Sequence, residues 1–122
     1  MFGFFERPKL VPQFEPTEAV TRELARELTL AGRLTLINDG SNAALGETEM
    51  MVIAGFRRIP LEVPDEWRAL TLASGGRRQG TVRWTLTLDA PLRADAGELS
   101  ISLRDQKHKK WEWRLPFAFE RR

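Results

Sequence analysis

Cysteine and tyrosine are absent from this chain of 122 residues, and histidine occurs once. Without cysteine the protein forms no disulfide, has no thiolate nucleophile and offers no thiolate ligand to a metal. With His108 as its single histidine, one chain cannot supply the set of imidazoles that many metal sites use. We therefore expect no cofactor and no metal centre.

Long apolar runs and a strong excess of one charge are also missing. No segment approaches the roughly 20 apolar residues of a transmembrane helix. The first residues, MFGFFERP, lack the basic region and the long apolar region of a signal peptide. We expect a cytoplasmic protein with no membrane span. The net charge of +2, from 19 Lys and Arg against 17 Asp and Glu, gives little reason to expect a general polyanion binder.

What remains is an ordinary globular composition, with 42% hydrophobic and 30% charged residues in a length that suits one domain. Phenylalanine and proline are concentrated at the start, where proline disfavours helix and removes backbone donors. We expect residues 1–15 to form an extended arm and residues 16–122 to form the domain. Phe2, Phe4 and Phe5 either pack on that domain or form a hydrophobic arm that binds a partner.

Residues 17–28 fit two descriptions. Val20, Leu24 and Leu28 are four apart, which is helical spacing among good helix formers. From Leu28 onward, however, leucine alternates with other residues as in a strand. Residues 17–28 are therefore either a short N-terminal helix or an extension of that strand. The following NDGSN stretch predicts a turn, with Gly40 able to adopt a positive φ.

Strict alternation is the clearest pattern in the chain. In TVRWTLTL, residues 81–88, apolar residues alternate with threonine and arginine, and residues 99–104 and 111–119 repeat this pattern. Pro60 indicates an edge strand or a bulge. About seven short strands separated by turns predict an all-β fold, a single antiparallel immunoglobulin-like β-sandwich. The expected core consists of Leu34, Leu36, Val52, Val82, Trp84, Leu86, Leu99, Ile101, Leu103, Trp113, Leu115 and Phe117.

The order of features over residues 56–103 resembles that of a known family. RRIPLEVP is followed by a glycine-rich turn, then by TVRWTLTLDAPL and GELSISL. This order resembles the sandwich of arrestin-like proteins, including the bacterial sporulation-control type. The resemblance implies an immunoglobulin-like fold and a scaffold or regulatory binding role. It carries over no functional residue, and this chain has the length of one sandwich whereas arrestins have two.

Catalytic constellations are weak in this sequence. His108 and Asp105 lie in RDQKHKK, an expected hairpin loop with no evident nucleophile nearby. ASGGRRQG differs from a phosphate-binding loop, because it lacks the lysine–serine/threonine pair and precedes a strand. We therefore expect a protein that is not an enzyme.

Basic residues beside tryptophan raise the question of nucleic-acid binding, most clearly in KHKKWEWRLPF, residues 107–117. A single-strand binder needs exposed aromatic side chains as well as cations. Trp84, Trp111 and Trp113 share the parity of aliphatic neighbours, so we expect them to face the core. KHKK then becomes a solvated hairpin tip, and Glu112 and Arg114 face outward.

The residues that alternate with the apolar ones are expected to point outward and to form a polar sheet face. Either Leu103 pairs with Trp111, or the register shifts by two and places Arg104 opposite Glu112, which we expect because opposite charges pair favourably. Thr81, Arg83, Thr85 and Thr87 are expected to lie alongside. The candidate partner-binding residues are Arg83, Arg104, Lys107, Lys109, Lys110, Glu112 and Arg114. We predict a non-enzymatic protein-binding or scaffold module that can self-associate; the alternative is a nucleic-acid-binding accessory protein that uses the basic loops.

Overall fold

The structure is a computed structural model that describes residues 7–105 and 109–122. Within these ranges, none of the helical segments is long and apolar enough to span a bilayer. The elements in chain order are β1 (Leu10–Arg22), β2 (Glu27–Asn38), β3 (Ala43–Ala54), β4 (Arg57–Leu61), the 3₁₀ helix η2 (Asp65–Trp67), β5 (Leu70–Leu72), β6 (Arg77–Thr87), β7 (Ala96–Asp105), β8 (Lys110–Ala118) and β9 (Glu120–Arg121).

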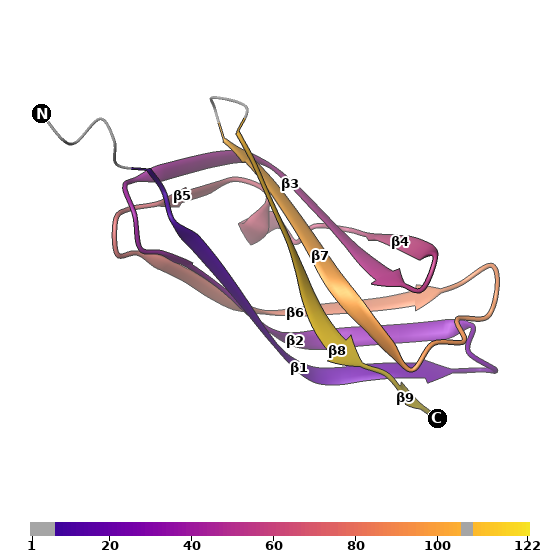
Figure 1. Cartoon of the computed structure of the whole chain (residues 1–122). Coiled ribbons are helices and arrows are strands. Elements are labelled where there is room, and N and C mark those ends of the chain that lie inside the picture. Colours follow the sequence, from indigo (N-terminus) through magenta and orange to yellow (C-terminus); the bar gives the residue numbers. More distant parts are fainter. Residues whose placement is uncertain (1–6, 106–108) are drawn as a thin grey trace, which may run out of the picture.

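Two sheets stack face to face, which confirms the expected all-β sandwich (Figure 1). Sheet A has the strand order β6-β2-β1-β9, and sheet B has the order β4-β3-β7-β8, with β5 also beside β3. The described pairs are antiparallel except for the short β1–β9 pair. Beyond the expected strands, β5 and β9 are short additions of 3 and 2 residues. Pro60 lies in the edge strand β4, as its missing backbone donor predicts.

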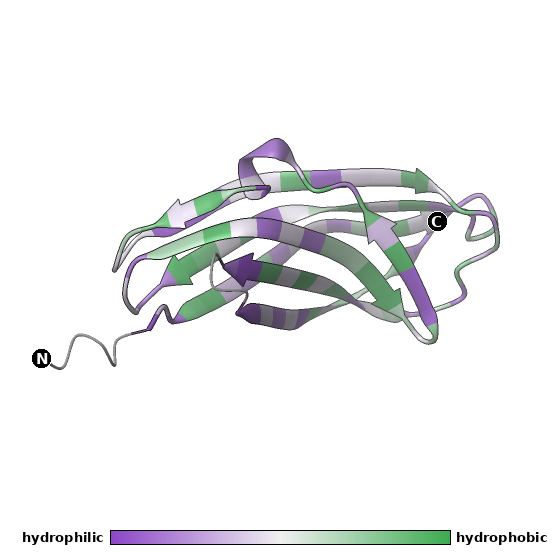
Figure 2. Cartoon of the chain, turned by 90° about the horizontal axis from the view of Figure 1, so that it is seen from above, coloured by the Kyte–Doolittle hydropathy of each residue, from purple (hydrophilic) through white to green (hydrophobic). Residues whose placement is uncertain are grey.

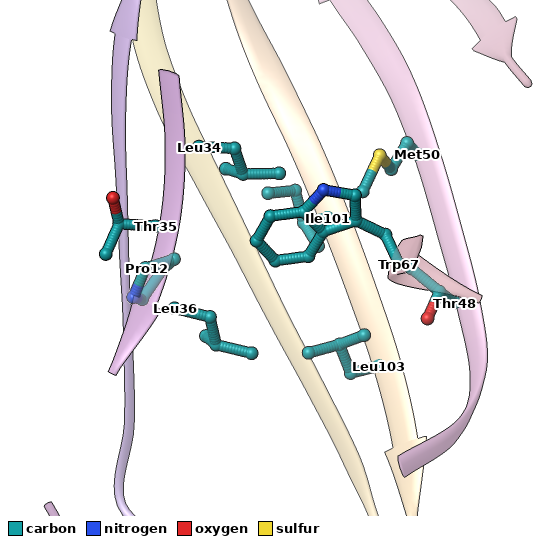
Figure 3. Close-up of a pocket in the computed structure, with 9 residues that line it drawn as sticks. All are labelled: Pro12, Leu34, Thr35, Leu36, Thr48, Met50, Trp67, Ile101 and Leu103. Carbon is teal, nitrogen blue, oxygen red and sulfur yellow. The ribbon is translucent and has the colours of Figure 1, made fainter. Parts of the chain in front are cut away.

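The alternation in the sequence places the apolar side chains between the sheets, and Figure 2 shows hydrophobic and hydrophilic bands alternating along the strands. Of the expected core residues, all but three are buried. Leu86, Trp113 and Leu115 are partly buried and pack against the core. An additional core member is Trp67 of η2, whose indole lies between side chains of both sheets (Figure 3). A residual cavity of about 10 Å³ beside this ring is lined by Leu34, Met50 and Ile101, among others.

The short N-terminal helix considered for residues 17–28 is wrong, because β1 and β2 form a hairpin there. Val20 and Leu28 are buried in the sheet, whereas Leu24 is 91% exposed at the hairpin tip, so the helical spacing does not correspond to one buried face. Glu23, Leu24 and Ala25 all have positive φ, a conformation that is costly for residues with a Cβ. Tertiary pairing therefore overrides the helix propensity of this segment.

Strand β1 also extends into the expected arm. Its first residues, Leu10 to Glu15, pair with β2, and the ring of Phe14 contacts that of Phe117 with centroids 6.3 Å apart. This part of the arm therefore belongs to sheet A. Phe2, Phe4 and Phe5 lie outside the described residues.

One buried asparagine ties together three segments at the end of the sandwich where β1 begins. Asn38 is 0% exposed. Its amide nitrogen donates to the carbonyls of Ser41 (2.7 Å) and Leu72 (3.1 Å), and its carboxamide oxygen accepts from the backbone of Lys9 (3.2 Å) and Gly40 (3.0 Å). Gly40 does not adopt the positive φ that glycine permits: among the described glycines only Gly55 and Gly75 have one. Gly40 is needed for close packing instead, since a Cβ there would overlap the Arg7 carbonyl.

Candidate binding surface on the outer face of sheet B

The predicted partner-binding residues separate into two groups in the structure. Arg104 of β7 and Lys110, Glu112 and Arg114 of β8 lie together on the outer face of sheet B. Lys109 is exposed just before β8. Arg83 lies on β6 in sheet A, so the expectation of one continuous surface with Arg83 and its threonine neighbours is wrong. Lys107 lies outside the described residues.

Arg83 participates in the packing of its own sheet. Its guanidinium lies 2.9 Å from the Glu18 carboxylate, which is also 3.6 Å from Arg22. Glu18 and Arg83 both pair with Ala31 of β2 in the sheet, so their ion pair crosses over this small buried residue. The three charges therefore cover a small-residue stretch of sheet A and carry no separate argument for a binding site.

The register of the β7–β8 hairpin differs from the expected one. Leu103 pairs with Trp111, which places Arg104 opposite Lys110. The like charges are compensated from other directions, because Arg104 lies 3.8 Å from Glu47 on β3 and Lys110 lies 3.6 Å from Glu112 on its own strand. The hairpin end is also closed by two hydrogen bonds between Asp105 and Lys109, at 3.0 Å and 2.7 Å.

Three strands, β3, β7 and β8, contribute to this face in cross-strand rows. Two acidic residues of β3, Glu47 and Glu49, were missed by the sequence reasoning. Their signal is the GETEM stretch, where they alternate with Thr48 and Met50. A shallow hollow of about 60 Å³ lies among the charged side chains. The rows are Glu47–Arg104–Lys110, Glu49–Ser102–Glu112, Met51–Ser100–Arg114 and Ile53–Glu98–Pro116.

The tryptophans do not form an exposed stacking surface. Trp111 and Trp113 are half-buried and pack against the core, as their parity predicts. Lys109 lies over the Trp111 ring, with its Nζ 4.8 Å from the ring centre. Trp67 and Trp84 are buried, and the Trp84 indole N–H donates to the Glu62 carbonyl at 2.7 Å. The basic residues of β8 therefore lack the open aromatic partners typical of single-strand binders.

Groups suited to metal binding are not gathered on this face. Across residues 7–105 and 109–122, no cluster of three or more His, Asp or Glu side chains is placed to hold a metal ion. His108 lies outside the described residues. The outer face of sheet B thus carries charges of both signs around a shallow hollow, and is suited to complementary contacts.

Comparison with solved structures places the fold among known β-sandwiches. The chain is similar to Spo0M, a sporulation control protein from Bacillus subtilis, with a TM-score of 0.56 and 13% identity over 93% of this chain and 49% of that one. It is also similar to a protein assigned as ApaA from Bordetella pertussis, with a TM-score of 0.51 and 14% identity over 93% and 90% of the two chains. No family model and no curated protein matches the sequence. At this identity the likeness to Spo0M supports the arrestin-like resemblance at the level of the fold.

Proposed function

We propose that this chain is a non-enzymatic protein-binding or scaffold module, and that it binds its partner through the outer face of sheet B. The observation that carries the proposal is a set of charged side chains on three adjacent strands, namely the half-buried Arg104 and the exposed Glu47, Glu49, Lys110, Glu112 and Arg114. Their backbone is fixed by the sheet, so only the side chains need ordering when a partner binds.

The mixture of signs favours a protein over a nucleic acid. A polyanion is attracted by cations alone, whereas Glu47, Glu49 and Glu112 stand among the cations of this face. Alternating charges instead match a surface with the inverse pattern and disfavour partners that place like charges together. A cytoplasmic scaffold role agrees with the arrestin-like resemblance of the fold.

Charge reversal on this face should weaken partner binding. We expect the double substitution Arg104→Glu/Lys110→Glu to weaken partner binding at least about tenfold, because it places two further anions beside Glu47 and Glu112. The matched control is Arg33→Glu/Arg77→Glu, which makes the same charge change on the outer face of sheet A, where neither arginine forms an ion pair with a described residue. The measurement is quantitative capture from a native-host lysate by wild type and both variants, with thermal midpoints recorded to exclude unfolding.

Equal retention of the captured proteins by both double variants would contradict the proposal. A salt-sensitive gel shift on DNA or RNA that is lost in a Lys109→Glu/Lys110→Glu variant would instead establish the nucleic-acid alternative. The two assays test different requirements. Binding of DNA or RNA in the gel shift depends on the cations alone, whereas binding of the protein partner depends on the cations together with the neighbouring carboxylates.

A further inference from the structure

The turn between β3 and β4 exposes a phenylalanine completely. Phe56 has 108% relative exposure, and Leu24 is the other fully exposed large apolar residue of the described chain. Ala54 pairs with Arg57, so Gly55 and Phe56 form a two-residue turn in which Gly55 has a φ of 61°. Because Phe56 buries no surface in this structure, it contributes nothing to the core and adds apolar surface to the outside.

This turn is anchored rather than loosely attached. The Arg57 guanidinium donates to the carbonyls of Ala90 (2.9 Å) and Pro91 (3.0 Å) and lies 3.5 Å from the Asp89 carboxylate. These contacts fix the turn to the connection between β6 and β7, at the same end of the sandwich (Figure 1). Phe56 is therefore presented from a backbone of fixed position, as an anchor residue of an interface requires.

A hollow of about 570 Å³ lies directly beside this turn. It opens on the outer face of sheet B, and the charged Glu98 and Arg114 of the rows described above also line it. Its apolar lining includes Ile53, Gly55, Ala96, Pro116 and Ala118. The floor is supported from behind, since a Cβ on Gly97 would come within 2.9 Å of the Phe119 ring.

Charges of opposite sign flank the hollow without meeting each other. Arg58, Ile53 and Glu98 occupy one cross-strand row, with Ile53 in the middle. Within the described residues neither Arg58 nor Glu98 forms an ion pair, although Glu18 and Arg83 do bridge a central residue in the same way on sheet A. The surface thus combines the exposed Phe56 ring and a mostly apolar hollow with two charges, Arg58 and Glu98, that form no ion pair with a described residue.

We propose that a second copy of this chain covers this surface, each Phe56 entering the hollow of the other copy and each Arg58 meeting the other copy's Glu98. A two-fold axis that passes between Phe56 and the hollow produces two copies of the Phe56 contact and two copies of the Arg58–Glu98 pair. Such duplication is what an isologous interface requires. This surface lies toward the opposite end of sheet B from Arg104 and Lys110 and shares only Arg114 with the partner-binding face, so the inference goes beyond the proposed binding of a different protein. Because the surface is small, we expect a weak dimer with a dissociation constant on the order of 100 µM.

Sedimentation velocity on the purified chain, from micromolar to millimolar concentration, tests whether Phe56 is needed for dimerisation. We expect wild type to dimerise as concentration rises and Phe56→Ser to remain monomeric. The matched control, Leu24→Ser, removes the other exposed apolar residue and should dimerise like wild type. All three should share one thermal midpoint, because both side chains are fully exposed.

A charge swap tests the pairing independently. Arg58→Glu and Glu98→Arg should each weaken the dimer about tenfold, and the double variant Arg58→Glu/Glu98→Arg should restore it, because each swapped residue again meets its opposite. A wild type that stays monomeric at millimolar concentration, or a dimer that survives Phe56→Ser, overturns the proposal. A double variant as weak as the single ones overturns the Arg58–Glu98 pairing. No other protein is present in these measurements, so their failure is distinct from a failure of partner capture.

Discussion

Asn38→Leu should destabilise the protein by about 3–5 kcal/mol, the largest effect we expect from a single polar residue. The substitution keeps the branched shape of the side chain but removes an amide that accepts from two backbone N–H groups and donates to three backbone carbonyls, those of Ser41, Leu72 and Ala73. The carbonyl of Leu72 then loses a partner in a fully buried bond, and the backbone N–H groups of Lys9 and Gly40 each lose a partner in a partly buried one. Each such group costs about 1–3 kcal/mol when it is left unpaired.

The measurement is equilibrium unfolding in denaturant together with the thermal midpoint, which should fall by roughly 10–20 °C. The matched control is Asn42→Ala, in the loop that follows Asn38 and β2. The exposed Asn42 accepts one hydrogen bond, from the Ser74 backbone at 2.9 Å, and its loss should cost no more than about 1 kcal/mol. Equal costs for the two asparagines would contradict the role given to Asn38.

Trp67→Ala alone should lower the free energy of unfolding by about 3–5 kcal/mol, because it empties the space between the sheets that the indole fills (Figure 3). The side chain is 2% exposed and comes from the short η2 helix rather than from a strand. Its removal enlarges the cavity of about 10 Å³ that already lies beside Leu34 and Ile101. Equilibrium unfolding measures this loss directly.

The indole nitrogen allows a sharper comparison. Trp67 Nε1 is buried and has no hydrogen-bond partner among the described residues, whereas Trp84 Nε1 donates to the Glu62 carbonyl. Trp67→Phe therefore removes an unpaired donor, and we expect it to cost about 1 kcal/mol less than Trp84→Phe. A Trp67→Phe variant that unfolds as easily as Trp67→Ala, or more easily than Trp84→Phe, would contradict this account of the core.

The sequence predicted the sandwich and most of its core because one sheet face is buried, and burial imposes period two wherever a strand is long enough. Residues 81–88 show this most clearly: their parity placed Val82 and Trp84 inside. Parity also assigned Trp111 and Trp113 to the core side of β8 and so removed the aromatic half of the apparent basic–aromatic patch in KHKKWEWRLPF.

Parity does not determine which strands share a sheet. It also does not distinguish two registers that differ by two residues, because both place the same side chains inside. Both registers of the β7–β8 hairpin keep Leu103 and Trp113 inside, so only charge pairs of about 0.2–1 kcal/mol distinguished them. Glu47 on β3 compensates Arg104, and no local pattern reveals that β3 lies beside β7. Because the sequence does not reveal which strands are neighbours, Arg83 was assigned to the face of the wrong sheet. For the same reason the hydrogen-bond partners of Asn38 were not predicted.

We propose that a partner protein covers the outer face of sheet B in the complex. Carboxylate footprinting tests it most directly: exposed Asp and Glu are labelled with a carbodiimide and an amine, with and without the captured partner, and read by mass spectrometry. We predict that labelling of Glu49 and Glu112 falls on binding, while Glu15 on sheet A and Glu66 in η2 are labelled equally in both states. Protection of Glu15 or Glu66 with Glu49 and Glu112 still fully labelled would contradict the account.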